Sequence, residues 1–188
     1  MLALTAYDRY VEKLFDRLKR FTVALSNAGI QYRIVGGMAV FLHVSERDSM
    51  AARLTNDVDV AVDRRDVEAI ARAVEAFGFT HRHDAGLDML VDTADPKARN
   101  AVHLIFVREK VRPEYVEPVP DFSPVPATED GMLVAPVADL IRMKLTSFRL
   151  KDRVHIQDMD GVDLITPEIE AALPEVLRER LAQVRATE

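Results

Sequence analysis

The sequence predicts a mixed α/β domain with a C-terminal helical part, and two observations carry this prediction. Up to residue 107, segments with the period of a strand alternate with segments that have the period of a helix, and from residue 136 only helical periods remain. This order is typical of a mixed sheet flanked by helices. The length of 188 residues suffices for one compact core with a small appended part.

The first segments predict a helix, a strand and a second helix. Apolar residues recur every three or four positions over 7–28, which predicts a helix that ends at a glycine. Residues 30–35 are short and rich in β-branched side chains, and predict a buried strand. Gly36 and Gly37 follow as a turn, and the apolar residues 38–44 favour a buried helix.

The middle of the chain predicts most of the sheet. Residues 57–63 alternate aspartate with aliphatic side chains, so Asp57 and Asp59 lie on one face of a strand. Residues 64–77 have a helical period that ends at a glycine. Three more strands are expected, at 79–82, 88–91 and 101–107.

Prolines mark the next part of the chain. Five of the fourteen residues in 113–126 are proline, which excludes a helix or a central strand and predicts an extended surface loop. The remaining elements are a short strand at 132–135 and helices at 136–149, 151–161 and 166–185, the last interrupted at Pro174. We therefore expect an α/β core over 1–135 and a C-terminal helical region over 136–188 packed on it.

Composition narrows the class of protein. The net charge of −6 argues against a general basic surface for nucleic acid, and the lack of tryptophan leaves little for base stacking. Without cysteine there is no disulfide, thiolate zinc site or cysteine nucleophile. No apolar run is long enough to span a membrane, and the N-terminus lacks the pattern of a signal peptide, so we expect a cytoplasmic protein without a membrane partner.

Two motifs together indicate chemistry on phosphates. The Gly36-Gly37 turn between a strand and a helix exposes backbone N–H groups at the positive end of the helix, which favours a polyphosphate. Asp57 and Asp59 follow twenty residues after the second glycine, on one strand face, where two carboxylates suit a hard divalent cation. Each motif alone is most often a plain turn or a solvated strand edge, and their combination gives the signal its weight.

In these residues the chain resembles the nucleotidyltransferase fold superfamily, in the branch of the AbiEii-type toxin nucleotidyltransferases and related small proteins. The resemblance covers the two glycines, the pattern Arg53-x-Thr55-x-Asp57-Val58-Asp59, and the segment 139–158, which contains a helical lysine and a Lys-Asp pair. It implies a nucleotidyltransferase-like mixed sheet flanked by helices.

The resemblance also implies roles for these residues. Gly36 and Gly37 would hold the phosphates of a nucleoside triphosphate, while Asp57 and Asp59 would bind Mg²⁺ or Mn²⁺. Arg53 would reach a phosphate oxygen.

Four further residues have implied roles around that centre. Thr55 would orient the acidic pair, and Lys144, the matched lysine, would place a point charge on the phosphates or the leaving group. Asp152 and Asp158 match the later acids of the branch, although Asp152 could instead cap its helix.

One residue departs from the superfamily pattern. Many members have a third carboxylate on a later strand, where this chain has His103. A histidine can act as a general base near neutral pH, but Mg²⁺ prefers oxygen ligands. The chain is thus either a one-metal or histidine-assisted enzyme or a degenerate relative that binds without turnover, unless Asp88 or Asp92 on the neighbouring strand replaces the missing acid.

Other histidines have plainer interpretations. His81 and His83 alternate on a strand, where exposed edge residues are more common than a zinc site. His43 is expected to be a hydrogen-bonded core residue. His155 belongs either to the site or to a helix surface.

The resulting hypothesis is an enzyme that transfers a nucleoside monophosphate from a nucleoside triphosphate to an acceptor hydroxyl of RNA such as tRNA, a protein or a small molecule. The alternative is a catalytically degenerate protein of the same fold that binds nucleotide or serves as a toxin–antitoxin-type partner. The third hypothesis is a metal-binding or structural module unrelated to nucleotides. The proline-rich loop and the terminal helices, or else a homodimer or a partner protein, would supply acceptor specificity.

Overall fold

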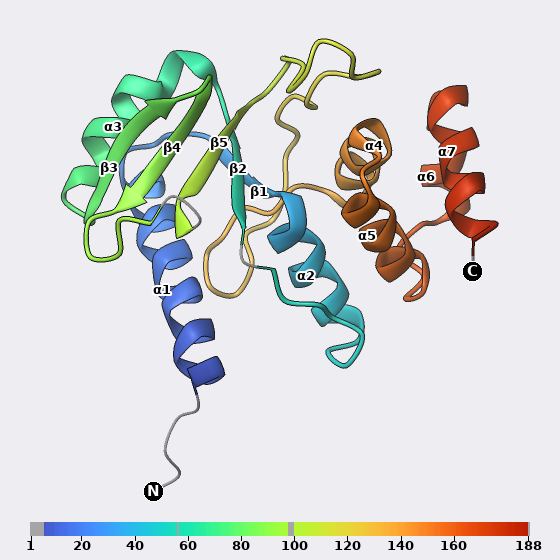
Figure 1. Ribbon diagram of the computed structural model, residues 1–188, viewed down its shortest axis with the longest axis horizontal. Helices are drawn as coiled ribbons and strands as arrows, with labels where there is room; N and C mark the ends of the chain where they lie inside the picture. Colours follow the sequence, from blue (N-terminus) through green and yellow to red (C-terminus); the bar gives the residue numbers. More distant parts are fainter. Residues whose placement is uncertain (1–5, 56, 98–99, 188) are drawn as a thin grey trace, which may run out of the picture.

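The computed structural model describes residues 6–55, 57–97 and 100–187, which form one five-stranded sheet flanked by helices (Figure 1). The strands are β1 (Tyr32–Val35), β2 (Val58–Val62), β3 (Phe79–Asp84), β4 (Leu87–Asp92) and β5 (Val102–Phe106). They lie in the order β1-β2-β5-β4-β3, with β2 and β5 parallel and the other neighbours antiparallel. The prediction of a mixed α/β fold with a C-terminal helical part is confirmed.

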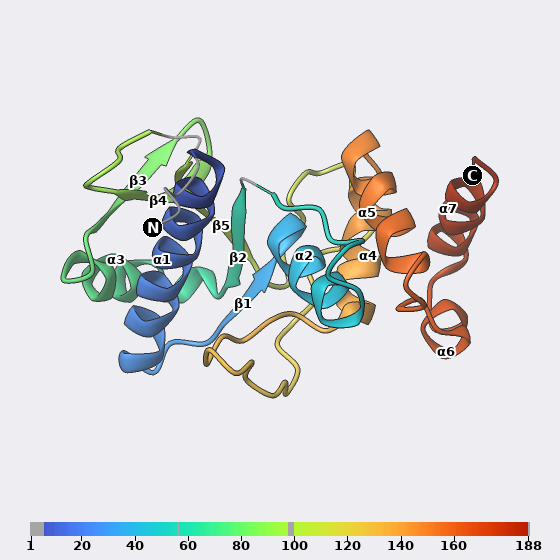
Figure 2. The same ribbon diagram turned by 90° about the horizontal axis from the view of Figure 1, so that it is seen from below.

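The helices are arranged in layers along the long axis of the molecule. They are α1 (Ala6–Asn27), α2 (Gly36–Arg47), the 3₁₀ turn η1 (Arg64–Asp66), α3 (Val67–Glu75), α4 (Val137–Ser147), α5 (Leu150–Asp160), α6 (Pro167–Ala171) and α7 (Glu175–Arg185). In Figure 2, α1 and α3 lie at one end, α2 follows β1, and α4 with α5 comes next, ahead of α6 and α7. No helix of the described residues is long and apolar enough to cross a bilayer.

The long N-terminal helix packs on the sheet through one apolar stripe. Leu14, Leu18, Phe21 and Leu25 are completely or almost completely buried, at the spacing of one helical face. Phe21 makes edge contacts with Tyr32 of β1 and with a phenylalanine of β3. Burial of each such side chain contributes about 1.5 to 3 kcal/mol, so this stripe fixes α1 on the sheet.

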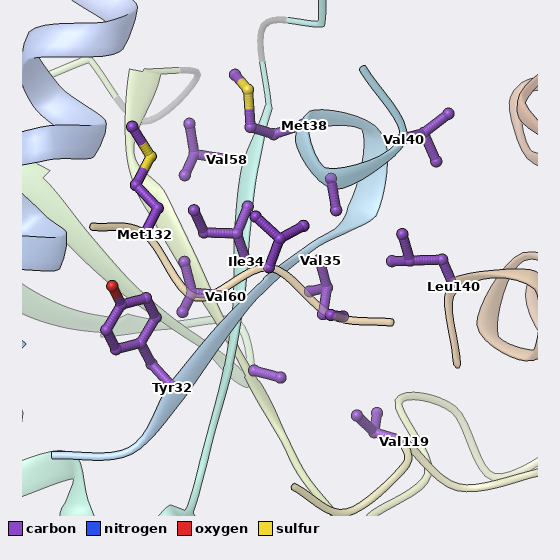
Figure 3. Close-up of a cluster of buried hydrophobic side chains, with 14 of the residues drawn as sticks. Tyr32, Ile34, Val35, Met38, Val40, Val58, Val60, Val119, Met132 and Leu140 are labelled. Atoms are coloured by element: carbon purple, nitrogen blue, oxygen red, sulfur yellow. The ribbon is translucent and has the colours of Figure 1, made fainter. Parts of the chain in front are cut away.

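The core beside β1 and β2 fixes the backbone that leads into the site. Ile34 and Val60 are opposite each other in the two strands and fully buried. Figure 3 shows them in a cluster with Met38, Val58 and Met132. The junction between β1 and α2 is therefore held close to β2.

Several predicted boundaries were wrong, each for a local reason. Gly36 and Gly37 are the first residues of α2 instead of a separate turn. The helix expected over 64–77 is split, because the Asp63 side chain accepts the N–H of Arg65 and caps η1 before α3 begins. The helix expected over 136–149 ends earlier, because Phe148 has a left-handed backbone (φ 50°).

The strand expected over 132–135 is a single parallel bridge between Ile34 and Val134. Two hydrogen bonds flank it, from Ile34 N–H to the carbonyl of Leu133 at 2.8 Å and from Ala135 N–H to the carbonyl of Ile34 at 3.0 Å. The following Pro136 begins the approach to α4, so the ladder cannot continue.

The proline-rich loop over 113–126 is extended, as expected, but it is only partly a surface loop. Val119 is buried and exchanges backbone hydrogen bonds with Arg108 and Glu109. The guanidinium of Arg33 donates to the carbonyl of Ser123 and lies over a phenylalanine ring in the loop. The loop is therefore fixed against the core.

The C-terminal helix supports the end of α4. Arg180 of α7 donates to the carbonyls of Leu145 and Thr146, at 2.7 and 2.8 Å, and so satisfies carbonyls that a helix end leaves unpaired.

The expected absence of a signal peptide rests partly on residues 1–5, which lie outside the described residues.

Candidate functional site

The start of α2 lies directly against the acidic strand. Val35, the last residue of β1, pairs with Asp59 of β2, so Gly36 follows beside Asp59. Gly36 has a positive φ of 68°, and a Cβ there would lie 2.2 Å from Oδ2 of Asp59. Only glycine permits this backbone and this approach, which brings a carboxylate to the first turn of the helix.

The two aspartates lie on one face, as the period of two predicted. Asp57 immediately precedes β2, and Asp59 is its second residue. Their side chains are 45% and 26% exposed, so a ligand from solvent can reach both. The Asp57 N–H donates to Oγ1 of Thr55 at 3.3 Å, which connects Thr55 to the acidic pair.

His103 lies beside Asp59. The two residues are opposite each other in the parallel strands β5 and β2, and Nδ1 of His103 is 3.7 Å from Oδ1 of Asp59. The approach of this carboxylate raises the pKa of His103 above its usual value, although partial burial opposes the shift. A larger share of His103 is therefore protonated near neutral pH than for an unperturbed histidine.

Neither candidate acid on β4 lies opposite His103, although Asp88 lines a cavity together with His103 and the acidic pair. Met89, not Asp88, is opposite His103, and neighbouring residues of a strand point to opposite faces. Asp88 instead accepts hydrogen bonds from His81 and pairs with His83. Asp92 pairs with Arg20 of α1, on the far side of the sheet.

The predictions for the other histidines are confirmed only in part. His43 bonds to the carbonyl of Ala135 at 2.9 Å, as expected, but it is only half-buried and so is not a full core residue. β3 is an edge strand, and His83 on it is exposed as predicted. His81 is only 24% exposed, because its Nε2 lies 2.8 Å from Asp88. Within the described ranges, no three histidine or acidic side chains gather into a metal site.

The turn between α4 and α5 brings positive charge to the acidic pair. Lys144 is buried and its Nζ lies 3.1 Å from Asp152, which is completely buried. Asp152 also accepts from Ser147 Oγ at 2.8 Å and from Arg149 Nε at 2.7 Å. Lys151 reaches back to Asp57, with Nζ 3.2 Å from Oδ2. Three residues at this turn thus surround the Asp152 carboxylate, and a fourth, Lys151, contacts the acidic pair.

Burial shifts the ionisation of this group. It lowers the pKa of Lys144, and the charge of Asp152 opposes that shift. Burial alone would raise the pKa of Asp152, but Arg149 and Lys144 bring it down to about 2. Asp152 is therefore a carboxylate throughout the physiological range. It also accepts the backbone N–H of Arg149 at the start of α5, so the prediction that Asp152 caps its helix is confirmed, while a role in the site stays a prediction.

A second contact joins the loop before β2 to α5. Arg53 Nε lies 2.9 Å from Asp158, whose burial raises its pKa against the effect of this arginine. Thr55 and His155 both pack on Gly37, and a Cβ there would lie 2.9 Å from Thr55 Oγ1 and 3.3 Å from the His155 ring. Arg53 and Asp158 thus form an ion pair of their own, separate from the ion pairs of Asp152 with Lys144 and Arg149.

Two cavities meet at the acidic pair. One has a volume of about 470 Å³ and the other about 400 Å³. Both are lined by Asp57, Asp59, Lys144, Arg149 and Lys151. The larger one extends past His103 along the proline-rich loop, whereas the smaller one is lined by Gly37, Arg53, Thr55 and His155.

His155 is expected to stay neutral well below neutral pH. Its burial and the charge of Lys144 lower its pKa to about 4, from an unfolded value near 6.5. The unfolded chain then binds the extra proton between pH 6.5 and pH 4, so the contribution to stability is complete above pH 6.5 and is lost as the pH falls toward 4. From pH 7 to pH 5 the wild type should lose about 1 to 2 kcal/mol more than His155→Gln in urea unfolding. Equal losses in the two proteins would contradict the neutral histidine.

Sequence reasoning missed the connections across this site. It named Lys151 as part of a Lys-Asp pair and left the place of His155 open. It found neither the contact between Lys151 and Asp57 nor the packing of His155 on Gly37. The positive φ of Gly36 was also hidden. The signal in the sequence for Lys151 and His155 was the dense run of charged residues after position 148.

Comparisons with known proteins support the fold. No family model matches the chain, and no curated protein is similar to it in sequence. Among solved structures, the chain is similar to an antigenic nucleotidyltransferase-like protein from Paracoccidioides brasiliensis, with a TM-score of 0.60 and 17% identity over 94% of this chain and 89% of that one. It also matches the antibiotic-resistance factor ANT(2'')-Ia in solution, with a TM-score of 0.47 and 11% identity over 94% and 84% of the two chains.

The sheet order, the flanking helices and the match above a TM-score of 0.5 agree with each other. At 17% identity this similarity concerns the fold alone. The chain therefore has a nucleotidyltransferase-like fold.

Proposed function

We propose that this protein is a nucleotidyltransferase that transfers a nucleoside monophosphate from a nucleoside triphosphate to an acceptor hydroxyl. The observation that carries the proposal is the position of Asp57 and Asp59, at the junction of two cavities and against the first turn of α2. Lys144, Arg149 and Lys151 line both cavities, and these three cationic side chains support a substrate with several negative charges. The Lys-Asp pair at 151 and 152 supports a place in the AbiEii-type branch.

The acidic pair fits one Mg²⁺ or Mn²⁺ ion. Both carboxylates are accessible oxygen ligands on one face, while the third position is a histidine, which does not suit Mg²⁺. The triphosphate and water would supply the remaining ligands. The metal ion would neutralise charge that develops on the phosphates.

Each of the two cavities would bind one of the two substrates. The smaller one, lined by Gly37, Arg53 and Thr55, would hold the triphosphate, and the larger one, lined by His103, would hold the acceptor. The acceptor oxygen forms a bond to the α-phosphorus, the bond to the bridging oxygen breaks, and pyrophosphate leaves. Lys144 and Lys151 stabilise the charge of the leaving group, and the hydroxyl proton passes to a base or to water.

A thermal-shift panel tests this function. ATP, GTP, CTP and UTP are each added with and without Mg²⁺ or Mn²⁺. A nucleotide at 100 times its dissociation constant should add about 2.7 kcal/mol, which raises Tm by about 5 to 10 °C. The shift should require metal and vanish in Asp57→Asn/Asp59→Asn. The matched control is Asp84→Asn/Asp130→Asn, which removes the same charge from exposed positions. No metal-dependent shift with any nucleotide would contradict the proposal.

A second candidate function is nucleotide binding without turnover, favoured by His103 in register with Asp59. The variant His103→Asp separates the two functions in a transfer assay with labelled nucleotide. An active enzyme that uses His103 loses activity on this substitution, whereas a degenerate one gains activity because a carboxylate is restored.

A further inference from the structure

Lys151 is bound to one of the carboxylates that the proposed function assigns to a metal ion. Its Nζ lies 3.2 Å from Oδ2 of Asp57. A divalent cation on Asp57 would come within a few ångströms of this ammonium group, and like charges at that distance repel each other. Lys151 and the metal ion therefore compete for the same carboxylate.

The contact is one that a metal ion can displace. The side chains of Lys151 and Asp57 are 52% and 45% exposed, and ion pairs this exposed are weak because water screens them. Lys144 offers the opposite case, since it is only 7% exposed and bound to the fully buried Asp152. Of the two lysines, Lys144 is fixed and Lys151 can move.

A displaced Lys151 can bind phosphate oxygens in the cavities that it lines. It lines both cavities, including the smaller one that Gly37 and Arg53 also line. Its flexible four-carbon stem and three donors suit the oxygens of a phosphate chain. The ammonium group can therefore exchange Asp57 for a phosphate without a change of fold.

We infer that Lys151 is an exchange residue that neutralises Asp57 in the empty site and binds the nucleotide phosphates once a metal ion has displaced it. This inference rests on the proposed function. Lys151 then opposes the binding of a metal ion alone and favours the binding of a metal ion together with phosphates. A lysine that only attracts phosphates, or only supports the fold, does not have these opposite effects.

The test compares wild type with Lys151→Met for two probes, neither of which requires turnover. MnCl₂ alone is titrated and followed by electron paramagnetic resonance, and inorganic tripolyphosphate with saturating Mg²⁺ is titrated by calorimetry. We expect Lys151→Met to bind Mn²⁺ about twofold to fivefold more tightly, because the competing ion pair is gone. It should bind tripolyphosphate at least about tenfold more weakly, because a charged hydrogen bond is lost.

Two controls separate the exchange from general effects of charge. Lys19→Met removes the same charge from an exposed position on α1 and should change neither affinity. Lys151→Arg keeps the charge and should retain both behaviours.

The outcomes distinguish this inference from the function on which it rests. If the wild type binds neither probe, the proposed function fails and the inference fails with it. If the wild type binds both, but Lys151→Met changes both affinities in the same direction or leaves Mn²⁺ binding unchanged, the inference is overturned while the proposed function stands.

Discussion

Replacement of Gly36 by alanine is expected to abolish metal and nucleotide binding and to lower the free energy of unfolding by about 2 to 5 kcal/mol. Two effects add up. A Cβ at φ 68° is strained, and it would lie 2.2 Å from Oδ2 and 3.0 Å from Cβ of Asp59. The Asp59 side chain must therefore rotate or its strand must shift, and either change moves the carboxylate away from Asp57.

Gly131→Ala is the matched control for this prediction. Gly131 also has a positive φ, of 76°, but a Cβ there would meet no atom within 4 Å. Its substitution should therefore cost only the backbone strain, about 1 to 2 kcal/mol, and leave Mn²⁺ binding unchanged. Urea unfolding and Mn²⁺ titration measure both properties. If Gly36→Ala retains binding and loses no more stability than Gly131→Ala, the contact with Asp59 does not shape the site.

The sequence pattern could predict which residues share a face. Asp57 and Asp59 alternate with aliphatic residues, and a period of two places both carboxylates on one side of a strand whatever that strand pairs with. The order of helices and strands followed from periods in the same way. These properties are local, because each depends on the residues of one segment.

The pattern could not predict which segments meet at the site. The position of Gly36 depends on the register of β1 with β2, and the position of His103 depends on the register of β2 with β5. Neither register can be read from a single strand, since a shift of two residues leaves the faces unchanged. Lys151 and Asp57 are 94 residues apart in the chain. The packing of α5 against α2, which in turn packs on β2, brings them together.

Local propensity failed where a backbone feature overrode it. The apolar period continues through Phe148, but this residue is left-handed and ends α4. The guanidinium groups of Arg153 and Arg180 lie over its ring, 4.3 and 5.1 Å from the centroid, and these contacts stabilise the turn. The turn between α4 and α5 then places Lys144 and Arg149 around Asp152.

The second large effect is expected at Asp152. In Asp152→Asn, the buried Lys144 and the adjacent Arg149 lose the carboxylate that neutralises them. Removal of one partner from a buried ion pair costs about 3 to 5 kcal/mol, because the other charge stays buried without compensation. The added change Lys144→Met removes that charge, so the double variant should be more stable than Asp152→Asn alone. A double variant that is less stable than the single one would show that Lys144 stabilises the fold independently of Asp152.

The pH dependence of this difference gives an independent check. The pKa of Asp152 is about 2 in the folded protein and near 3.9 in the unfolded chain. A lowered folded pKa stabilises the protein above the unfolded value, and this stabilisation is lost as the pH falls toward 2. Because asparagine resembles the protonated acid, the difference between wild type and Asp152→Asn should stay constant from pH 7 to pH 5 and decrease below about pH 4. Urea unfolding at pH 7, 5 and 3.5 measures it, and a difference that already shrinks at pH 5 would mean that Lys144 and Arg149 do not hold this carboxylate ionised.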